Sequence, residues 1–278
     1  MTLPSSSALV QWSDIPSPAW KKIMEIVSST EWGVTQFGRG VGEIRLVCKG
    51  WGDECDQHIT TISLDDVRGP TTVSEMRTFL QRFPSLESAV FTREEGILTD
   101  GNLTLPTWAG ALDSLSTSLI RLCFIGDGAY DGEYLRGLAG CTALTTLRLR
   151  CSFPSVLGLE GLSSLESLWL SGTREVLDDD AFSSLAGLTN LTDLDLTNCH
   201  KLSPTHGFAT LICFTALTSL YLEGTRANDS VLLGTVSKLP ALTYLTIKNF
   251  ELDPGFSKTA ARSLKNTLPK INIWWLVD

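Results

Sequence analysis

A leucine pattern of the form L-x-x-L-x-L recurs along this chain, and it limits the folds that the chain can adopt. Five consecutive clear copies begin at Leu144, Leu165, Leu191, Leu217 and Leu242, at intervals of 21 to 26 residues. Weaker copies begin at Ile59, Leu86, Leu119 and Leu268. A nearly constant period of this length is typical of stacked repeats, because one short unit cannot bury its own apolar face and its neighbours must cover it.

Each copy predicts a short strand followed by a helical stretch. Within x-L-x-L-x the leucines alternate with mostly polar residues, so one side of the strand is buried and the other faces solvent. Apolar stretches with helical spacing follow the strands, as at 180–187 and 229–239. We therefore expect residues 56–278 to form an α/β solenoid shaped as a horseshoe, with parallel strands on the concave side and helices on the convex side.

Small polar side chains recur at one place after the strands. Three residues beyond the last strand leucine stand Ser152, Thr173, Cys199 and Thr225. Such side chains suit a tight inward turn, whose buried backbone groups need hydrogen-bond partners. The stretch LTDLDLTNCHKL at 191–202 resembles the cysteine-containing leucine-rich repeats, which read roughly L-x-x-L-x-L-x-x-C-x-x-L. The resemblance implies the same horseshoe fold, although Phe250 takes the cysteine's place in the copy that begins at Leu242.

The head of the chain, residues 12–55, has a different pattern. After Ile15 and Pro16 comes a stretch whose apolar residues share one face of a predicted helix. A glycine-bearing segment at 31–42 follows, and a second short apolar helix is predicted at 44–51, with the sequence IRLVCKGW. This order resembles the F-box, a helical domain with a leucine- or isoleucine-proline start and a later helix that reads R-x-V-C-[KR]-x-W.

The F-box resemblance implies that the protein is the substrate receptor of an SCF-type ubiquitin ligase, with the head bound to a Skp-type adaptor and the repeats bound to a substrate. The residues that it assigns to the adaptor surface are Ile15, Pro16, Ile23, Ile26, Leu46, Val47, Cys48 and Trp51. The insert at 31–42 departs from the short link that is usual in the family. In the alternative interpretation, the head only caps the open end of the solenoid, as every repeat array requires, and the protein is a scaffold without ligase partners.

Composition and motifs argue against catalysis and against several partner classes. A net charge of −9 opposes nucleic-acid binding, which needs clustered Lys and Arg. The seven cysteines form no CxxC pair, and the run of acids at 178–180 reads as a helix start rather than a metal site. We expect no enzyme activity, cofactor or metal. Without a secretory signal or a run of about 18 apolar residues, we also expect no membrane partner and a cytoplasmic or nuclear location, which weakens a third interpretation as an extracellular recognition domain.

A partner is expected on the concave face, at the strand positions between and beside the leucines. The partner-binding residues that this rule predicts are Arg121, Arg148, Arg150, Trp169, Asp193, Asp195, Tyr221, Glu223, Tyr244 and Lys248, and the wider set of exposed strand positions includes Ser88 and Thr246. Arg148 and Trp169 should lie roughly 5 Å apart on adjacent strands. Guanidinium groups beside an indole suit an acidic or phosphorylated protein substrate, and the acidic residues further along would orient a basic flank of it.

Overall fold

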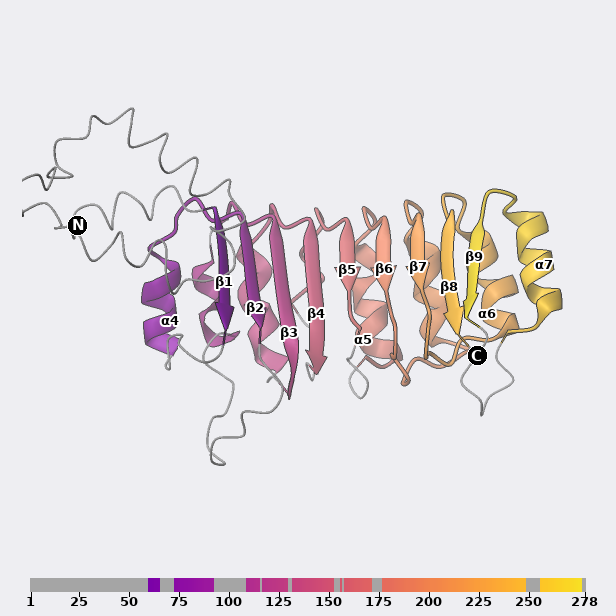
Figure 1. Ribbon diagram of the computed structural model, residues 1–278, viewed down its shortest axis with the longest axis horizontal. Coiled ribbons are helices and arrows are strands. Elements are labelled where there is room, and N and C mark those ends of the chain that lie inside the picture. Colours follow the sequence, from indigo (N-terminus) through magenta and orange to yellow (C-terminus); the bar gives the residue numbers. More distant parts are fainter. Residues whose placement is uncertain are drawn as a thin grey trace, which may run out of the picture.

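Every copy of the leucine pattern, clear or weak, forms one strand of a single parallel sheet. The computed structural model describes residues 60–65, 73–92, 109–115, 117–129, 132–152, 156, 158–171, 177–248 and 256–276. Its strands are β1 (Thr61–Asp65), β2 (Ser88–Thr92), β3 (Arg121–Ala129), β4 (Thr146–Ser152), β5 (Ser167–Trp169), β6 (Asp193–Asp195), β7 (Ser219–Tyr221), β8 (Tyr244–Lys248) and β9 (Asn272–Leu276). They lie side by side in chain order, and each is paired in parallel with the next (Figure 1). The predicted α/β solenoid is confirmed.

Helical segments return the chain along the other side of the sheet (Figure 1). The α-helices are α4 (Val73–Leu80), α5 (Asp179–Ser183), α6 (Asp229–Gly234) and α7 (Lys258–Thr267). The 3-10 segments are η3 (Ala109–Ser114), η4 (Gly132–Gly140), η5 (Ser184–Gly187), η6 (Gly207–Cys213) and η7 (Val236–Lys238). The helical stretches predicted at 180–187 and 229–239 are confirmed, but each splits into a short α-helix and a 3-10 segment. The 3-10 form rises about 2.0 Å per residue against 1.5 Å in an α-helix, so fewer residues cover the return path.

The core is a stack of leucines that the register aligns across the sheet. One row joins Leu147, Leu168, Leu194, Leu220 and Leu245 on five successive strands, and all five are fully buried. Burying each such side chain contributes about 1.5–3 kcal/mol relative to leaving it in water. The alternation read from the sequence therefore fixes which side of each strand meets the helices.

The turn position predicted after the strands holds a hydrogen-bonding side chain at Cys199 and Thr225, the two members of the set whose side chains the structure describes. The Cys199 thiol is fully buried and donates to the carbonyl oxygen of Leu170 in the preceding repeat at 3.6 Å. In the next repeat, Oγ1 of Thr225 donates to the carbonyl oxygen of Leu222 at 2.8 Å. Both groups add a hydrogen bond to a backbone carbonyl at the turn.

Acidic side chains at the starts of α5 and α6 connect neighbouring repeats. Oδ1 of Asp178 caps α5 by accepting from the Ala181 amide at 2.8 Å, as expected for a helix start. The following residue reaches across to the next repeat, where Asp179 accepts from the Ser203 amide at 2.8 Å. In the same way, Asp229 of α6 accepts from the Ser257 amide at 2.7 Å. Within the acids at 178–180, Asp178 therefore caps the helix and Asp179 connects it to the next repeat.

The head at 12–55 and its eight predicted adaptor-binding residues lie outside the described residues, so the F-box assignment stays a prediction. Among the residues that the structure does describe, no helix is both long and apolar enough to cross a membrane.

Candidate functional site

Two rows of side chains cross the concave face of the sheet, with one residue from each of the seven strands β3 to β9. The register of the strands aligns the first row as Arg121, Thr146, Ser167, Asp193, Ser219, Tyr244 and Asn272. It aligns the second row as Cys123, Arg148, Trp169, Asp195, Tyr221, Thr246 and Trp274. Most of the predicted partner-binding residues belong to these two rows, so the fold brings them together on one surface.

Trp169 on β5 is held from two directions. The guanidinium carbon of Arg148, on β4, lies 4.0 Å from the centre of the indole ring. On the other neighbouring strand, Oδ1 of Asp193 accepts a hydrogen bond from the indole Nε1 at 2.5 Å. The predicted adjacency of Arg148 and Trp169 is confirmed, and the contact is a cation–π interaction worth about 0.5–1 kcal/mol at an exposed site.

Two tyrosines extend the aromatic surface toward the C-terminal strands. The ring centres of Trp169 and Tyr221 are 6.2 Å apart, and those of Tyr221 and Tyr244 are 5.5 Å apart, with tilts of 47° and 49°. All three side chains are half-buried. We call Trp169, Tyr221 and Tyr244 the aromatic strip; it spans β5 to β8, from the middle of the concave face toward its C-terminal end.

Asp195 was predicted to be exposed on this face, and that prediction is wrong. Its side chain is only 8% exposed, and its Oδ1 accepts from the Thr197 amide at 2.8 Å. Strands two apart are separated by about 10 Å, yet the rings of Trp169 and Tyr221 approach to 6.2 Å. The two large side chains therefore lean toward each other over the shorter aspartate and bury it.

Two further polar residues on the concave face are buried. Thr246 is 5% exposed between its register neighbours Tyr221 and Trp274, and Ser88 is also buried. Both had been expected at exposed positions. Alternation gives the side of the sheet that a residue occupies, but the size of its neighbours decides whether water reaches it.

The charges on the concave face are separated along the solenoid. Arg121, Arg148 and Arg150 are exposed on β3 and β4, and none of them forms an ion pair with a carboxylate in the described part of the chain. Asp193 and Asp195 lie two to three strands further along, on β6. The pKa of the Tyr221 hydroxyl is raised by burial first and then by the nearby Asp193, Tyr244 and Asp195. The β6–β8 region therefore disfavours further negative charge, whereas the β3–β4 region attracts it.

Cys123, which shares the second row with Arg148, is not an activated thiol. Burial raises its pKa above the ordinary value and outweighs the lowering effect of Arg148 and Arg150. Since the thiolate is the nucleophile, this residue stays protonated and unreactive near neutral pH. Within the described ranges, no three His, Cys, Asp or Glu side chains gather as a metal site would need.

The remaining predicted residues lie at the margins of the rows. Glu223 is half-buried just beyond β7, and its carbonyl oxygen accepts from the Asn198 amide at 2.8 Å. Lys248 ends β8, where the structure describes its backbone, paired in register with Leu276. The sequence rule predicted every member of the aromatic strip for this face, and it missed the burial of Asp195, Thr246 and Ser88.

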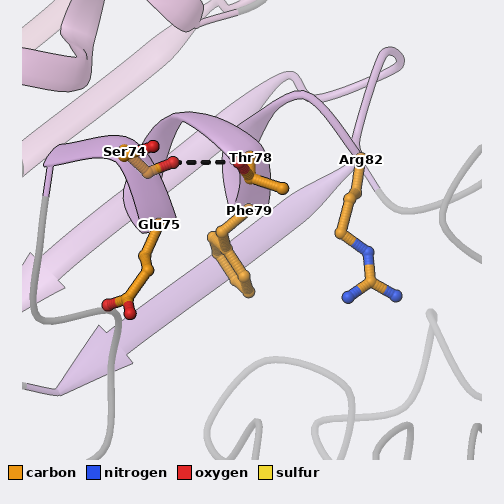
Figure 2. Close-up of a pocket in the computed structure, with 5 residues that line it drawn as sticks. All are labelled: Ser74, Glu75, Thr78, Phe79 and Arg82. Atoms are coloured by element: carbon orange, nitrogen blue, oxygen red, sulfur yellow. Dashed lines mark hydrogen bonds between the residues drawn. The ribbon is translucent and has the colours of Figure 1, made fainter.

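A separate hollow lies on the surface of α4 and the turn that follows it. Figure 2 shows its lining: Ser74, Glu75, Thr78, Phe79 and Arg82. Oγ1 of Thr78 donates to the backbone carbonyl of Ser74 at 2.9 Å, and Phe79 packs edge-on against Phe83 with ring centres 5.0 Å apart. None of the predicted partner-binding residues contributes to this hollow, which belongs to the helical side of the solenoid.

Comparison with solved structures identifies the fold. The chain is similar to internalin C2 from Listeria monocytogenes, with a TM-score of 0.56 and 22% identity over 81% of this chain and 84% of that chain. The chain folds as a leucine-rich-repeat solenoid. Lower similarity is found to the TLR13–ssRNA13 complex, with a TM-score of 0.49 and 18% identity over 70% of this chain and 26% of that chain. Identity at this level establishes the fold alone. No protein-family model matches the sequence, and no curated protein sequence does either.

Proposed function

We propose that this protein is a non-enzymatic adaptor that binds another protein on the concave face of its leucine-rich-repeat solenoid. The observation that carries the proposal is the aromatic strip, with Arg148 stacked on its first ring. Protein interfaces are enriched in Trp, Tyr and Arg, because these side chains combine large contact area with hydrogen-bonding capacity. The strip begins on β5, the middle strand of the sheet, and a bound partner that covers it would exclude water from three aromatic rings.

Cross-strand aromatic and charged pairs also stabilise a sheet that binds nothing. That explanation accounts for Trp169, whose ring contacts Arg148 and Asp193. It does not account for Arg121 and Arg150, which are exposed and form no ion pair with any described carboxylate. Guanidinium groups of this kind bind carboxylates and phosphates in a fork geometry. An acidic or phosphorylated segment of the partner is therefore the ligand that suits β3 and β4.

A more specific proposal concerns the class of complex. The IRLVCKGW motif at 44–51, directly followed by repeats, supports the role of substrate receptor in an SCF-type ubiquitin ligase in the cytoplasm or nucleus. In that role residues 12–55 bind a Skp-type adaptor of a cullin-RING ligase, and residues 56–278 bind the substrate. The alternative is a scaffold or regulator of the same fold whose head only caps the repeats.

The concave face is tested by capturing partners with the full chain and with two variants. Wild-type protein should retain a specific partner that the double variant Trp169→Ala, Tyr221→Ala loses. Lys238→Ala, on the convex side in η7, is the control and should retain it. A partner that leaves the control but stays on the double variant would place the interface on the convex side and contradict the proposal.

The ligase role has its own test, which uses the purified adaptor. Ile23→Asp together with Val47→Asp should abolish binding of a Skp-type adaptor from the same organism and leave partner binding on the concave face unchanged. Wild-type protein with no affinity for any such adaptor would exclude the ligase role and leave the scaffold alternative.

A further inference from the structure

We propose that the aromatic strip, together with Asp193 and Asp195, forms a site that receives one Lys or Arg side chain of the protein partner. The inference rests on the proposed function, because it assumes a protein ligand on the concave face. It adds the chemistry of one subsite: a cation at β5–β8, beside the region of β3–β4 that suits an anion.

The ring geometry matches what a cation needs. A Lys or Arg side chain is attracted to the face of an aromatic ring when it lies within about 6 Å of the ring centre. The centre of Tyr221 lies 6.2 Å from that of Trp169 and 5.5 Å from that of Tyr244. A cation between Tyr221 and one of these neighbours can therefore lie within that distance of two ring centres. Arg148 already binds the Trp169 ring in this manner, with 4.0 Å between its guanidinium carbon and the ring centre.

The two carboxylates of β6 supply the opposite charge. Oδ1 of Asp193 accepts from Trp169 Nε1, and Oδ1 of Asp195 accepts from the Thr197 amide. For both residues, the second oxygen has no donor among the described residues. Because Asp195 is 8% exposed and lies between two aromatic side chains, the attraction that its charge exerts on a nearby cation is screened less than at an open surface.

A buried hydroxyl without a partner adjoins the same rings. Thr246 is 5% exposed, and its Oγ1 has no hydrogen-bond partner among the residues that the structure describes. It pairs in register with Tyr221, and its side chain is on the concave side because Leu245 and Ile247 are buried in the core. An unpaired buried hydroxyl is costly, so a ligand that forms a hydrogen bond with this Oγ1 is favoured here. An ammonium or guanidinium group can supply this bond by donating to the hydroxyl oxygen.

The electrostatic surroundings point to the same sign of ligand. The pKa of Tyr221 is raised first by burial, which disfavours any charge, and then by Asp193, Tyr244 and Asp195; the negative charge of the two aspartates also opposes a bound carboxylate or phosphate. A partner segment that crosses the strands from β3 toward β8 thus contacts the arginines of β3 and β4 before the carboxylates of β6. The distance from β4 to β7 is about 14 Å, which an extended peptide spans in about four residues.

The test uses short uncharged peptides of one design, with a single central Arg, Lys, trimethyl-lysine, norleucine or Glu. Binding to the full chain is followed by the nuclear magnetic resonance signal of the Trp169 indole N–H, assigned by its disappearance in Trp169→Phe. The Arg and Lys peptides should shift this signal saturably, and the norleucine and Glu peptides should leave it unchanged. A stronger response to trimethyl-lysine than to Lys would show that ring contacts contribute more than hydrogen bonds to the same cation site.

Variants separate a site from general attraction to an acidic protein. Asp193→Asn keeps an oxygen that can accept from Trp169, and it should lower the affinity for the Arg peptide about tenfold or more. Tyr221→Ala should lower this affinity by a similar factor. Asp180→Asn removes the same charge from the exposed start of α5 and should change the affinity less than twofold. Equal binding of the norleucine peptide, or equal weakening by Asp180→Asn, would overturn the inference.

The peptide experiment and the partner-capture experiment can fail independently, so failure of the cation site is distinguishable from failure of the proposed function. If the concave variants lose the captured partner but the Arg and Lys peptides do not bind, the proposed function stands and the cation site is wrong. If the peptides bind but no partner depends on Trp169 and Tyr221, the cation site stands and the proposed function is wrong.

Discussion

The indole Nε1 of Trp169 donates a hydrogen bond of 2.5 Å to Oδ1 of Asp193, on the next strand of the sheet. This bond fixes the orientation of the ring, and Arg148 stacks on it from the strand before. Ordering a free side chain at an interface costs about 0.5–1.5 kcal/mol. Because Trp169 is already ordered within the chain, a partner that packs against it avoids most of that cost.

Trp169 and the neighbouring arginines should dominate affinity for the captured partner. Trp169→Ala should weaken binding by about 2 kcal/mol or more, which is about 30-fold, since central aromatic residues carry much of the energy of an interface. Arg148→Ala with Arg150→Ala should weaken binding and also reduce its dependence on salt. Affinities measured at two ionic strengths check both effects, with Lys238→Ala as the unaffected control. An unchanged salt dependence in the double variant would mean that these arginines do not face the partner.

The strand leucines should carry the stability of the stack. Leu194 is fully buried, so Leu194→Ala should lower the free energy of unfolding by about 2–5 kcal/mol through lost burial and the cavity left behind. Leu233, on α6, is 44% exposed, and the same substitution there should cost far less. Chemical denaturation of the two variants provides the comparison. Similar losses at both positions would contradict the assignment of the core side.

Asp195 should behave as a buried residue although it lies on the concave side. Asp195→Ala removes the acceptor of the Thr197 amide at a site that is 8% exposed, and the loss should be about 1–3 kcal/mol. Asp180→Ala removes an exposed carboxylate and should change stability by less than about 0.5 kcal/mol. The measurement is the midpoint of unfolding in denaturant. A neutral effect of Asp195→Ala would show that water reaches this carboxylate.

The Tyr221 hydroxyl should ionise above its ordinary range, and the folded state should lose stability at alkaline pH. Its pKa is raised above 10.0 by burial, Asp193, Tyr244 and Asp195, so the unfolded chain releases this proton at a lower pH than the folded chain. The resulting destabilisation begins as pH rises through the unfolded value, near 10, and grows up to the folded value. Asp193→Asn should lower the pKa of Tyr221, whereas Asp180→Asn should not change it. Ultraviolet absorbance titration, with Tyr221→Phe to assign the signal, measures the shift.

The sequence was sufficient to predict the strands and which side of each strand is buried. Strong and weak copies alike form strands, because the period of the leucines sets both the spacing of the repeats and the direction of every strand side chain. The contact between Arg148 and Trp169 was predictable for the same reason, since equivalent positions of neighbouring repeats are paired in the register.

The burial of Asp195 and Thr246 was not predictable from alternation. It depends on large residues at equivalent positions one repeat before and one repeat after, so the relevant pattern has the period of the repeat rather than of the strand. Reading one position down successive repeats gives Trp169, Asp195, Tyr221, Thr246 and Trp274. In that column, large rings alternate with short polar residues, and this signal could have indicated which polar residues are covered.

The bonds from Asp179 to the Ser203 amide and from Asp229 to the Ser257 amide have a consequence for how such a protein lengthens or shortens. Each joins a helix start in one repeat to a loop amide in the next, so a single copy of the leucine pattern does not contain both partners. A gene segment that encodes one copy alone would carry either the accepting aspartate or the donating serine amide, without the other partner of the hydrogen bond. The smallest portable piece of this architecture therefore spans two consecutive copies, and insertions or deletions should be tolerated best where they preserve such pairs.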